Sequence, residues 1–144
     1  MENSELRSEI KKIVLKMRSE NKTALIPIEA SGRHVHLSQN DVEKLFGSGY
    51  QLSQKRELSQ PGQFLAAEKI RLIGPRQVIN NVAILGPARG STQIELSKTD
   101  AVNLGVEAPL RLSGNTEDSA PLFIASQKEV IKVKEGAIIA KRHI

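Results

Sequence analysis

The sequence predicts a mainly β protein, a β-barrel with short capping helices that follows an N-terminal amphipathic helix. Three observations support this prediction. From Ile26 onward the chain consists of short runs rich in apolar and β-branched residues, which Gly and Pro separate. No second long helical pattern follows the N-terminal one. With 144 residues, of which 39% are apolar, the chain is long enough to bury a core of its own.

The N-terminal segment, residues 1–20, has the period of an amphipathic helix. Its apolar residues recur on one face with charged residues between them, namely Leu6, Ile10, Ile13, Val14 and Met17. This stripe can pack onto the protein's own domain or a sister subunit, or it can dock onto another protein. Residues 21–23 form a polar break, so we expect residues 21–144 to form a separate β-barrel region.

Seven runs in this region are predicted as strands, separated by Gly-Pro and Gly-Asn pairs. They are residues 26–31, 69–73, 78–85, 109–112, 122–125, 129–133 and 137–142. Because Gly86 and Pro87 directly follow Leu85, we expect that strand to end there and Arg89 to lie on a loop.

Composition narrows the possible functions. The absence of cysteine excludes disulfides, thiolate metal ligands and a cysteine nucleophile, which leaves His, Asp and Glu as metal ligands. The net charge of +5 favours anionic partners, but one Tyr and three Phe are too few for a nucleic-acid stacking platform. No apolar run is long enough to cross a bilayer and the N-terminus lacks a secretory signal, so we expect a soluble, cytosolic protein.

An internal repeat is the most informative pattern. Residues 36–42 are matched by residues 95–101, 59 positions later. In both copies a Ser precedes an Asp by three positions and a Gly follows, which predicts a strand that enters a short capped helix. His36 and Glu95 therefore lie at equivalent points, just before a helix. A third copy begins at residues 142–144, which repeat Arg33-His34-Val35.

His34 and His36 form an H-x-H pair whose side chains share one face of an extended strand. Such a pair can bind a metal ion, or it can be two surface histidines. His143, the third histidine of the chain, falls at the same position type of the repeat, and Glu95 adds a carboxylate. Three histidines and one carboxylate are a plausible zinc ligand set.

Arg89 is the candidate anion-binding residue. It precedes Glu95 by six positions on a Gly-Pro-Ala-Arg-Gly loop, and a guanidinium can bind phosphate oxygens in a bidentate manner. It can equally be a solvated loop arginine. The turn at residues 59–64 is rich in amide side chains and either lines a site or connects strands.

Five motifs closely resemble the PduL-type phosphate propanoyltransferases, the phosphotransacylases of bacterial microcompartments. The resemblance runs from about Ile26 to the last residue and is carried by residues 33–38, 58–64, 85–89, 93–101 and 136–144. It implies two β-barrels capped by short helices, with a dinuclear zinc site between them and coenzyme A bound nearby. The implied reaction is zinc-dependent: propanoyl-CoA or acetyl-CoA and phosphate interconvert with acyl phosphate and coenzyme A.

The resemblance also implies roles for particular residues. His34, His36, Glu95 and His143 match zinc-ligand positions, and Arg89 matches an active-site arginine. Residues 1–20 look like an encapsulation segment that binds shell or cargo proteins, which implies a cytoplasmic location in the microcompartment lumen. The oligomeric state stays open, a homo-oligomer included.

The chain departs from the family at its end. Family members continue past the position of His143 through a second H-x-H and a later histidine ligand, so two ligands and most of one barrel are missing here. A truncation, a fragment and a broken reading frame are all compatible with this. We expect little or no turnover from this chain. The alternatives are an inactive fragment that retains coenzyme A, zinc or shell-protein binding, and a nucleic-acid-binding barrel, which only the pI near 9.6 supports.

Overall fold

The computed structural model describes residues 32–141. The predicted N-terminal helix, the predicted strand at 26–31, the third repeat copy and His143 lie outside the described residues. Between residues 32 and 141, no helix combines the length and the apolar character that a membrane crossing requires.

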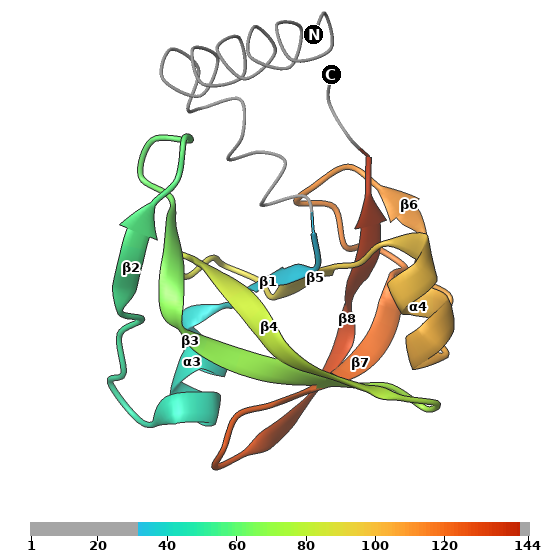
Figure 1. The fold of residues 1–144 in the computed structure, drawn as a ribbon, viewed down its shortest axis with the longest axis horizontal. Helices are drawn as coiled ribbons and strands as arrows, with labels where there is room; N and C mark the ends of the chain where they lie inside the picture. The colour runs from blue at the N-terminus through green and yellow to red at the C-terminus, as the bar shows by residue number, and fades with distance from the viewer. Residues whose placement is uncertain (1–31, 142–144) are drawn as a thin grey trace, which may run out of the picture.

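This part of the chain contains eight strands and two short helices (Figure 1). In chain order they are β1 (His34–His36), α3 (Gln39–Phe46), β2 (Gln54–Glu57), β3 (Phe64–Ile73), β4 (Val78–Gly86), β5 (Gln93–Glu95), α4 (Lys98–Leu104), β6 (Leu110–Arg111), β7 (Ala120–Ala125) and β8 (Val130–Ala140).

Six of these strands form a closed barrel, which confirms the predicted fold class. Neighbouring strands follow the order β3–β4–β1–β5–β8, and β7 pairs with both β3 and β8 and so completes the ring. β2 extends the sheet beyond β3, and β6 extends it beyond β8. β1 and β5 are neighbours in the ring, which brings the two repeat copies side by side.

The core lies inside the barrel and under the helices. β7 shows the expected alternation, since Ala120, Leu122 and Ile124 are buried while the residues between them are exposed. At the centre of β1 and β5, Val35 and Ile94 have no exposed surface. This apolar packing holds the two strands in place, although each has only three residues.

Both repeat copies form the predicted strand and capped helix. Ser38 and Ser97 are the N-caps, and each hydroxyl accepts a hydrogen bond from the backbone N–H of the Asp three positions later, at 3.1 and 3.0 Å. Gly47 and Gly105 end the helices, and Gly105 has the left-handed conformation, with φ of 85°.

The separate strands predicted at 129–133 and 137–142 are one strand, β8. A glycine usually ends a strand, but Gly136 is buried within β8. A Cβ there would lie 2.5 Å from Val133 and 3.1 Å from the Thr92 carbonyl, so the glycine permits close packing. β2 was not predicted because its four residues are all polar and exposed. β3 begins five residues before the predicted start, at Phe64.

The two copies are related by an approximate two-fold axis. β1 and β5 run antiparallel, with Val35 opposite Ile94 at the centre, His34 opposite Glu95 and His36 opposite Gln93. Because residues 59 apart are equivalent in the repeat, a two-fold rotation about the central pair exchanges the strands. β4 then lies parallel to β1, as β8 lies parallel to β5.

Candidate metal centre

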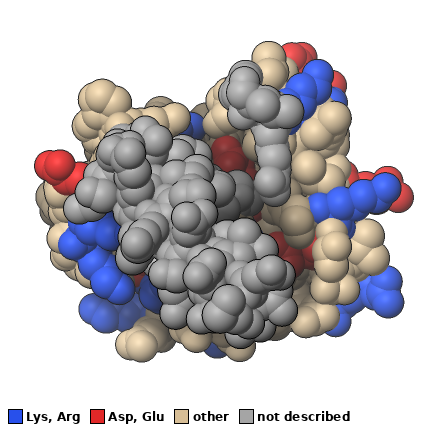
Figure 2. Space-filling model, turned by 45° about the horizontal axis from the view of Figure 1, so that its top comes forward, with Lys and Arg blue, Asp and Glu red and all other residues tan. Residues whose placement is uncertain are grey.

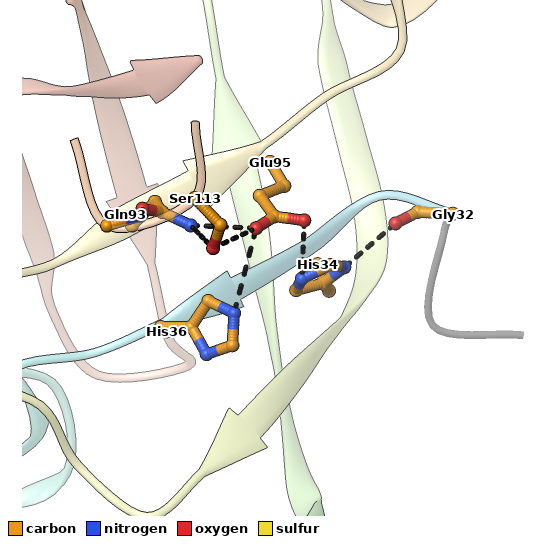
Figure 3. Close-up of polar contacts among 7 residues, drawn as sticks. Gly32, His34, His36, Gln93, Glu95 and Ser113 are labelled. Atoms are coloured by element: carbon orange, nitrogen blue, oxygen red, sulfur yellow. Dashed lines mark hydrogen bonds and ion pairs between the residues drawn. The ribbon is translucent and has the colours of Figure 1, made fainter. Parts of the chain in front are cut away.

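Three side chains predicted as metal ligands converge where β1 and β5 pair. The Nε2 atom of His34 lies 2.9 Å from one carboxylate oxygen of Glu95, and the Nε2 atom of His36 lies 3.9 Å from the other. The two imidazoles are only 6% exposed, and Glu95 is 16% exposed. Figure 3 shows the histidines projecting from β1 toward Glu95 on β5.

A backbone contact of its second ring nitrogen orients the His34 ring. Its Nδ1 atom lies 2.9 Å from the backbone carbonyl oxygen of Gly32, which can only accept a hydrogen bond. Nδ1 therefore carries a ring proton, which leaves Nε2, on the side of Glu95, as the atom that can bind a metal ion. The His36 ring meets the His34 ring edge to face, with centroids 5.0 Å apart.

The electrostatics favour a neutral His36 beside an ionised Glu95. Burial, and then the positive charges of His34 and Arg89, lower the pKa of His36 to about 3. Burial by itself would raise the pKa of Glu95, but the hydrogen bond from His34 and the Coulomb attraction of that ring lower it overall. Neutral imidazoles and an ionised carboxylate are the protonation states that bind metal ions.

The donor set fits a divalent metal ion. One ligand atom from each of His34, His36 and Glu95 lies within 4.8 Å of the other two, so a modest inward shift would place all three at the roughly 2.0–2.2 Å typical of zinc. Two imidazoles and a carboxylate are also the protein ligands of a known class of catalytic zinc sites, which keep a further position open.

Two polar residues that sequence reasoning did not single out hold Glu95 from its other side. The side-chain amide of Gln93 donates to the Glu95 carboxylate at 2.7 Å, and the Ser113 hydroxyl donates to the same oxygen at 3.1 Å. The repeat contained a signal for Gln93, which is equivalent to His34. The sequence contained none for Ser113, which arrives from a loop after β6.

Arg89 lies near the cluster, close enough to act on His36 electrostatically. It follows β4 on a loop, as predicted, and its backbone N–H donates to the Leu37 carbonyl at 2.8 Å, which attaches the loop to β1. The side chain is half-buried, and its charge is close enough to lower the pKa of His36, after the larger effects of burial and His34.

The amide-rich turn at residues 59–64 lies apart from the cluster. Together with Gln54 and Glu57 it lines a hollow beside β2, and none of the three candidate ligands contributes to that hollow. Its last residue, Phe64, packs against Gly86, where an added Cβ would lie 2.3 Å from the ring. Phe64 and Gly86 are paired residues of β3 and β4, so the end of the turn packs beside the strand that leads to Arg89.

Two cross-links join the strand start of each copy to the helix of the other. Arg33 donates two hydrogen bonds of 2.9 Å to the carboxylate of Asp100 in α4. Its repeat equivalent, Thr92, donates its hydroxyl to Asp41 in α3. The hydrogen bonds from Arg33 lower the pKa of Asp100. These links tie β1 and β5 to opposite helices and so help hold the register that aligns His34 with Glu95.

The barrel and the buried His-His-Glu cluster define a β-barrel protein with a candidate metal centre between two repeated strand–helix units. The sequence model of one family, described as phosphate propanoyltransferase, matches residues 27–144. The chain belongs to this family, which confirms the resemblance seen in its motifs.

Several curated relatives bear the same name, phosphate propanoyltransferase. The relative from Listeria monocytogenes is 50% identical over 83% of this chain and 56% of its own length. The relative from Clostridioides difficile is 48% identical over 85% of this chain and 59% of its own length. The Leptotrichia buccalis relative is 42% identical over the whole of this chain and 68% of its own length. The chain thus spans little more than half the length of the first two.

Proposed function

We propose that this chain carries the metal-binding half of a zinc-dependent phosphotransacylase, which converts acyl-CoA and phosphate to acyl phosphate and coenzyme A. The observation that carries the proposal is the convergence of His34, His36 and Glu95 in a family named for phosphate propanoyl transfer. Propanoyl-CoA is the acyl donor that the family name favours, and acetyl-CoA is the alternative.

His34, His36 and Glu95 would hold the zinc ion, with His143 as a further ligand from outside the described residues. A bound zinc ion supplies Lewis acidity, which stabilises negative charge as it develops on an oxygen of the reacting groups. The buried surroundings of the histidines strengthen every charge interaction at this position.

Arg89 would bind and orient phosphate beside the cluster. A guanidinium that pairs with two phosphate oxygens would leave one of the others free to attack the thioester carbonyl carbon. The new C–O bond forms as the C–S bond breaks, and the departing thiolate takes up a proton as free coenzyme A. Direct attack fits a chain that has no cysteine for an acyl-enzyme.

The net charge of +5 is compatible with two anionic substrates. Figure 2 shows that Lys and Arg side chains flank one face of the molecule, with Asp and Glu side chains among them. On this face the positive charge is not gathered in one patch. We assign phosphate recognition to Arg89.

The test compares this chain with a version extended by the remaining C-terminal residues of the Listeria monocytogenes relative. Both are loaded with zinc, and thiol release from propanoyl-CoA is followed with and without phosphate. We expect zinc binding by both and phosphate-dependent turnover by the extended chain, with little or none from residues 1–144. In the extended chain, Arg89→Ala should strongly reduce phosphate-dependent turnover and change the stability of the fold little.

Two results would contradict the proposal. One is a folded extended chain that releases no thiol in the presence of zinc and phosphate. The other is a metal-free extended chain that turns over as fast as the zinc-loaded one. A fully active chain of residues 1–144 would instead show that further ligands and a further barrel are dispensable.

We also propose that residues 1–20 direct the protein into a microcompartment through contacts with shell or cargo proteins. The amphipathic pattern and the polar break after it support this proposal. Deleting residues 1–20 should leave the melting temperature of the remainder nearly unchanged and abolish co-purification with co-expressed shell proteins. Loss of the fold on deletion would assign the apolar stripe to the core instead.

A further inference from the structure

Gln93 occupies an unusual position next to the candidate ligands. It is the repeat equivalent of His34 and lies directly opposite His36 in the β1–β5 pairing. Its side chain is buried, with only 2% of the residue exposed. A buried amide at this position can be a fourth metal ligand through its oxygen, or it can serve the ligands that surround it.

The hydrogen bonds decide the orientation of the amide. The backbone N–H of Gly114 donates to the Gln93 side chain at 2.6 Å. Since a backbone N–H can only donate, the atom facing Gly114 must be the amide oxygen. The NH₂ group therefore faces inward, where it donates to Glu95 at 2.7 Å and to the Ser113 hydroxyl at 3.1 Å.

This orientation removes Gln93 from the ligand set and separates the two oxygens of Glu95. Oε1 accepts hydrogen bonds from Gln93 and Ser113 and lies 3.9 Å from the Nε2 atom of His36, whereas Oε2 faces the Nε2 atom of His34 at the shorter distance of 2.9 Å. Ser113 accepts from Gln93 and donates to Glu95, so the three side chains form a closed triangle (Figure 3).

We propose that Gln93 is a positioning residue that makes Glu95 a monodentate metal ligand through Oε2, with Ser113 as its assistant. This inference rests on the proposed metal function. The two-fold relationship gives it a physical reason: one copy supplies a donor atom at this position, His34, and the other supplies an amide that fixes the carboxylate. Outer hydrogen bonds of this kind typically change metal affinity by about 10 to 100-fold.

The experiment uses the full chain and Gln93→Met, which keeps the length of the side chain and removes both polar groups. Co²⁺ and Zn²⁺ affinities are measured by competition with a chromophoric chelator, and the visible spectrum of bound Co²⁺ reports the ligand geometry. We expect affinity to fall about 10 to 100-fold and the Co²⁺ spectrum to change. Ser113→Ala, which removes one hydrogen bond, should show a smaller loss, and Gln39→Met on α3 should show none.

A second readout does not depend on metal. Crystal structures of the metal-free parent and Gln93→Met should show the Glu95 carboxylate turned away from His34 in the variant only. A folded variant with unchanged affinity and an unchanged Co²⁺ spectrum would overturn the proposal. An unchanged Glu95 carboxylate in the metal-free structure of the variant would also overturn it. A parent that binds no Co²⁺ would instead contradict the proposed metal function. Circular dichroism checks that each variant folds. If Gln93→Met does not fold, Gln93→Leu is measured in its place.

Discussion

The two strand–helix units, β1–α3 and β5–α4, share a backbone but differ in the side chains that meet between them. Each has a three-residue strand, a Ser N-cap and a glycine after the helix. At the strand ends, however, the first unit has two histidines, while the second has Gln93 and Glu95. Repetition thus supplies two matching frameworks, and divergence at two positions supplies complementary chemistry.

The cross-links between the units differ in the same way. The first unit reaches α4 with a charged, bidentate arginine, whereas the second reaches α3 with a neutral hydroxyl. Equivalent positions therefore make the same connection with different chemical groups. This comparison teaches that the shared features carry the fold and the unshared features carry the candidate metal site.

The largest effect is expected from making the first unit resemble the second. Replacing both His34 and His36 by Gln removes two of the three converging donors, and zinc affinity should fall by more than about 100-fold, beyond the range of outer-shell changes. Metal content measured by mass spectrometry checks this. Lys134→Gln, an exposed change on β8, is the control. Full zinc occupancy in a folded double variant would remove the pair from the site.

The pH dependence of stability should reveal the buried His36 of the first unit, whose equivalent in the second unit is Glu95. The pKa of His36 lies near 3 in the folded protein, mainly through burial, against an ordinary value of 6.5. The unfolded chain therefore binds the proton first, so the metal-free protein loses stability as pH falls from about 6.5 toward 3. Urea unfolding over this range measures the slope. His36→Gln should flatten it, and an identical slope in the two proteins would contradict the assignment.

The cross-links should differ in strength. Asp100→Asn weakens a charge-assisted pair, but Arg33 is 46% exposed, so we expect a loss of about 1–2 kcal/mol in the free energy of unfolding. Thr92→Val removes a hydroxyl that donates to the Asp41 carboxylate and accepts from the Ser38 backbone N–H, and it should cost about 0.5–1.5 kcal/mol. Urea unfolding at neutral pH compares them. A larger loss for Thr92→Val would show that the hydroxyl link is the stronger.

The helix caps should show the smallest difference, because they belong to the shared framework. Ser38→Ala and Ser97→Ala each remove a hydroxyl that accepts from a backbone N–H, and each should cost about 1 kcal/mol of stability. Thermal unfolding measures the two losses, with Ser→Thr at each position as the conservative control. If the losses of the two cap variants differ by more than the losses of the two cross-link variants, the caps are not equivalent.

The sequence alone was informative wherever the signal was local. The serine, aspartate and glycine spacing predicted both capped helices, and the period of two predicted that His34 and His36 share a face. The offset of 59 residues placed His36 and Glu95 at equivalent junctions. Each of these features is set within one copy of the repeat, because backbone dihedrals and hydrogen bonds over a few residues determine it.

The tertiary structure decided what depends on distant partners. β2 has no apolar pattern and exists because it pairs with β3, and Gly136 continues β8 because close packing around it requires a glycine. Ser113 reaches Glu95 only because a loop distant in sequence returns to β5. The sequence thus determined the repeated framework and three converging candidate ligands. Only the packing of separate segments decided that Ser113 joins Gln93 in holding Glu95, because a hydrogen bond between distant segments leaves no periodic trace in the chain.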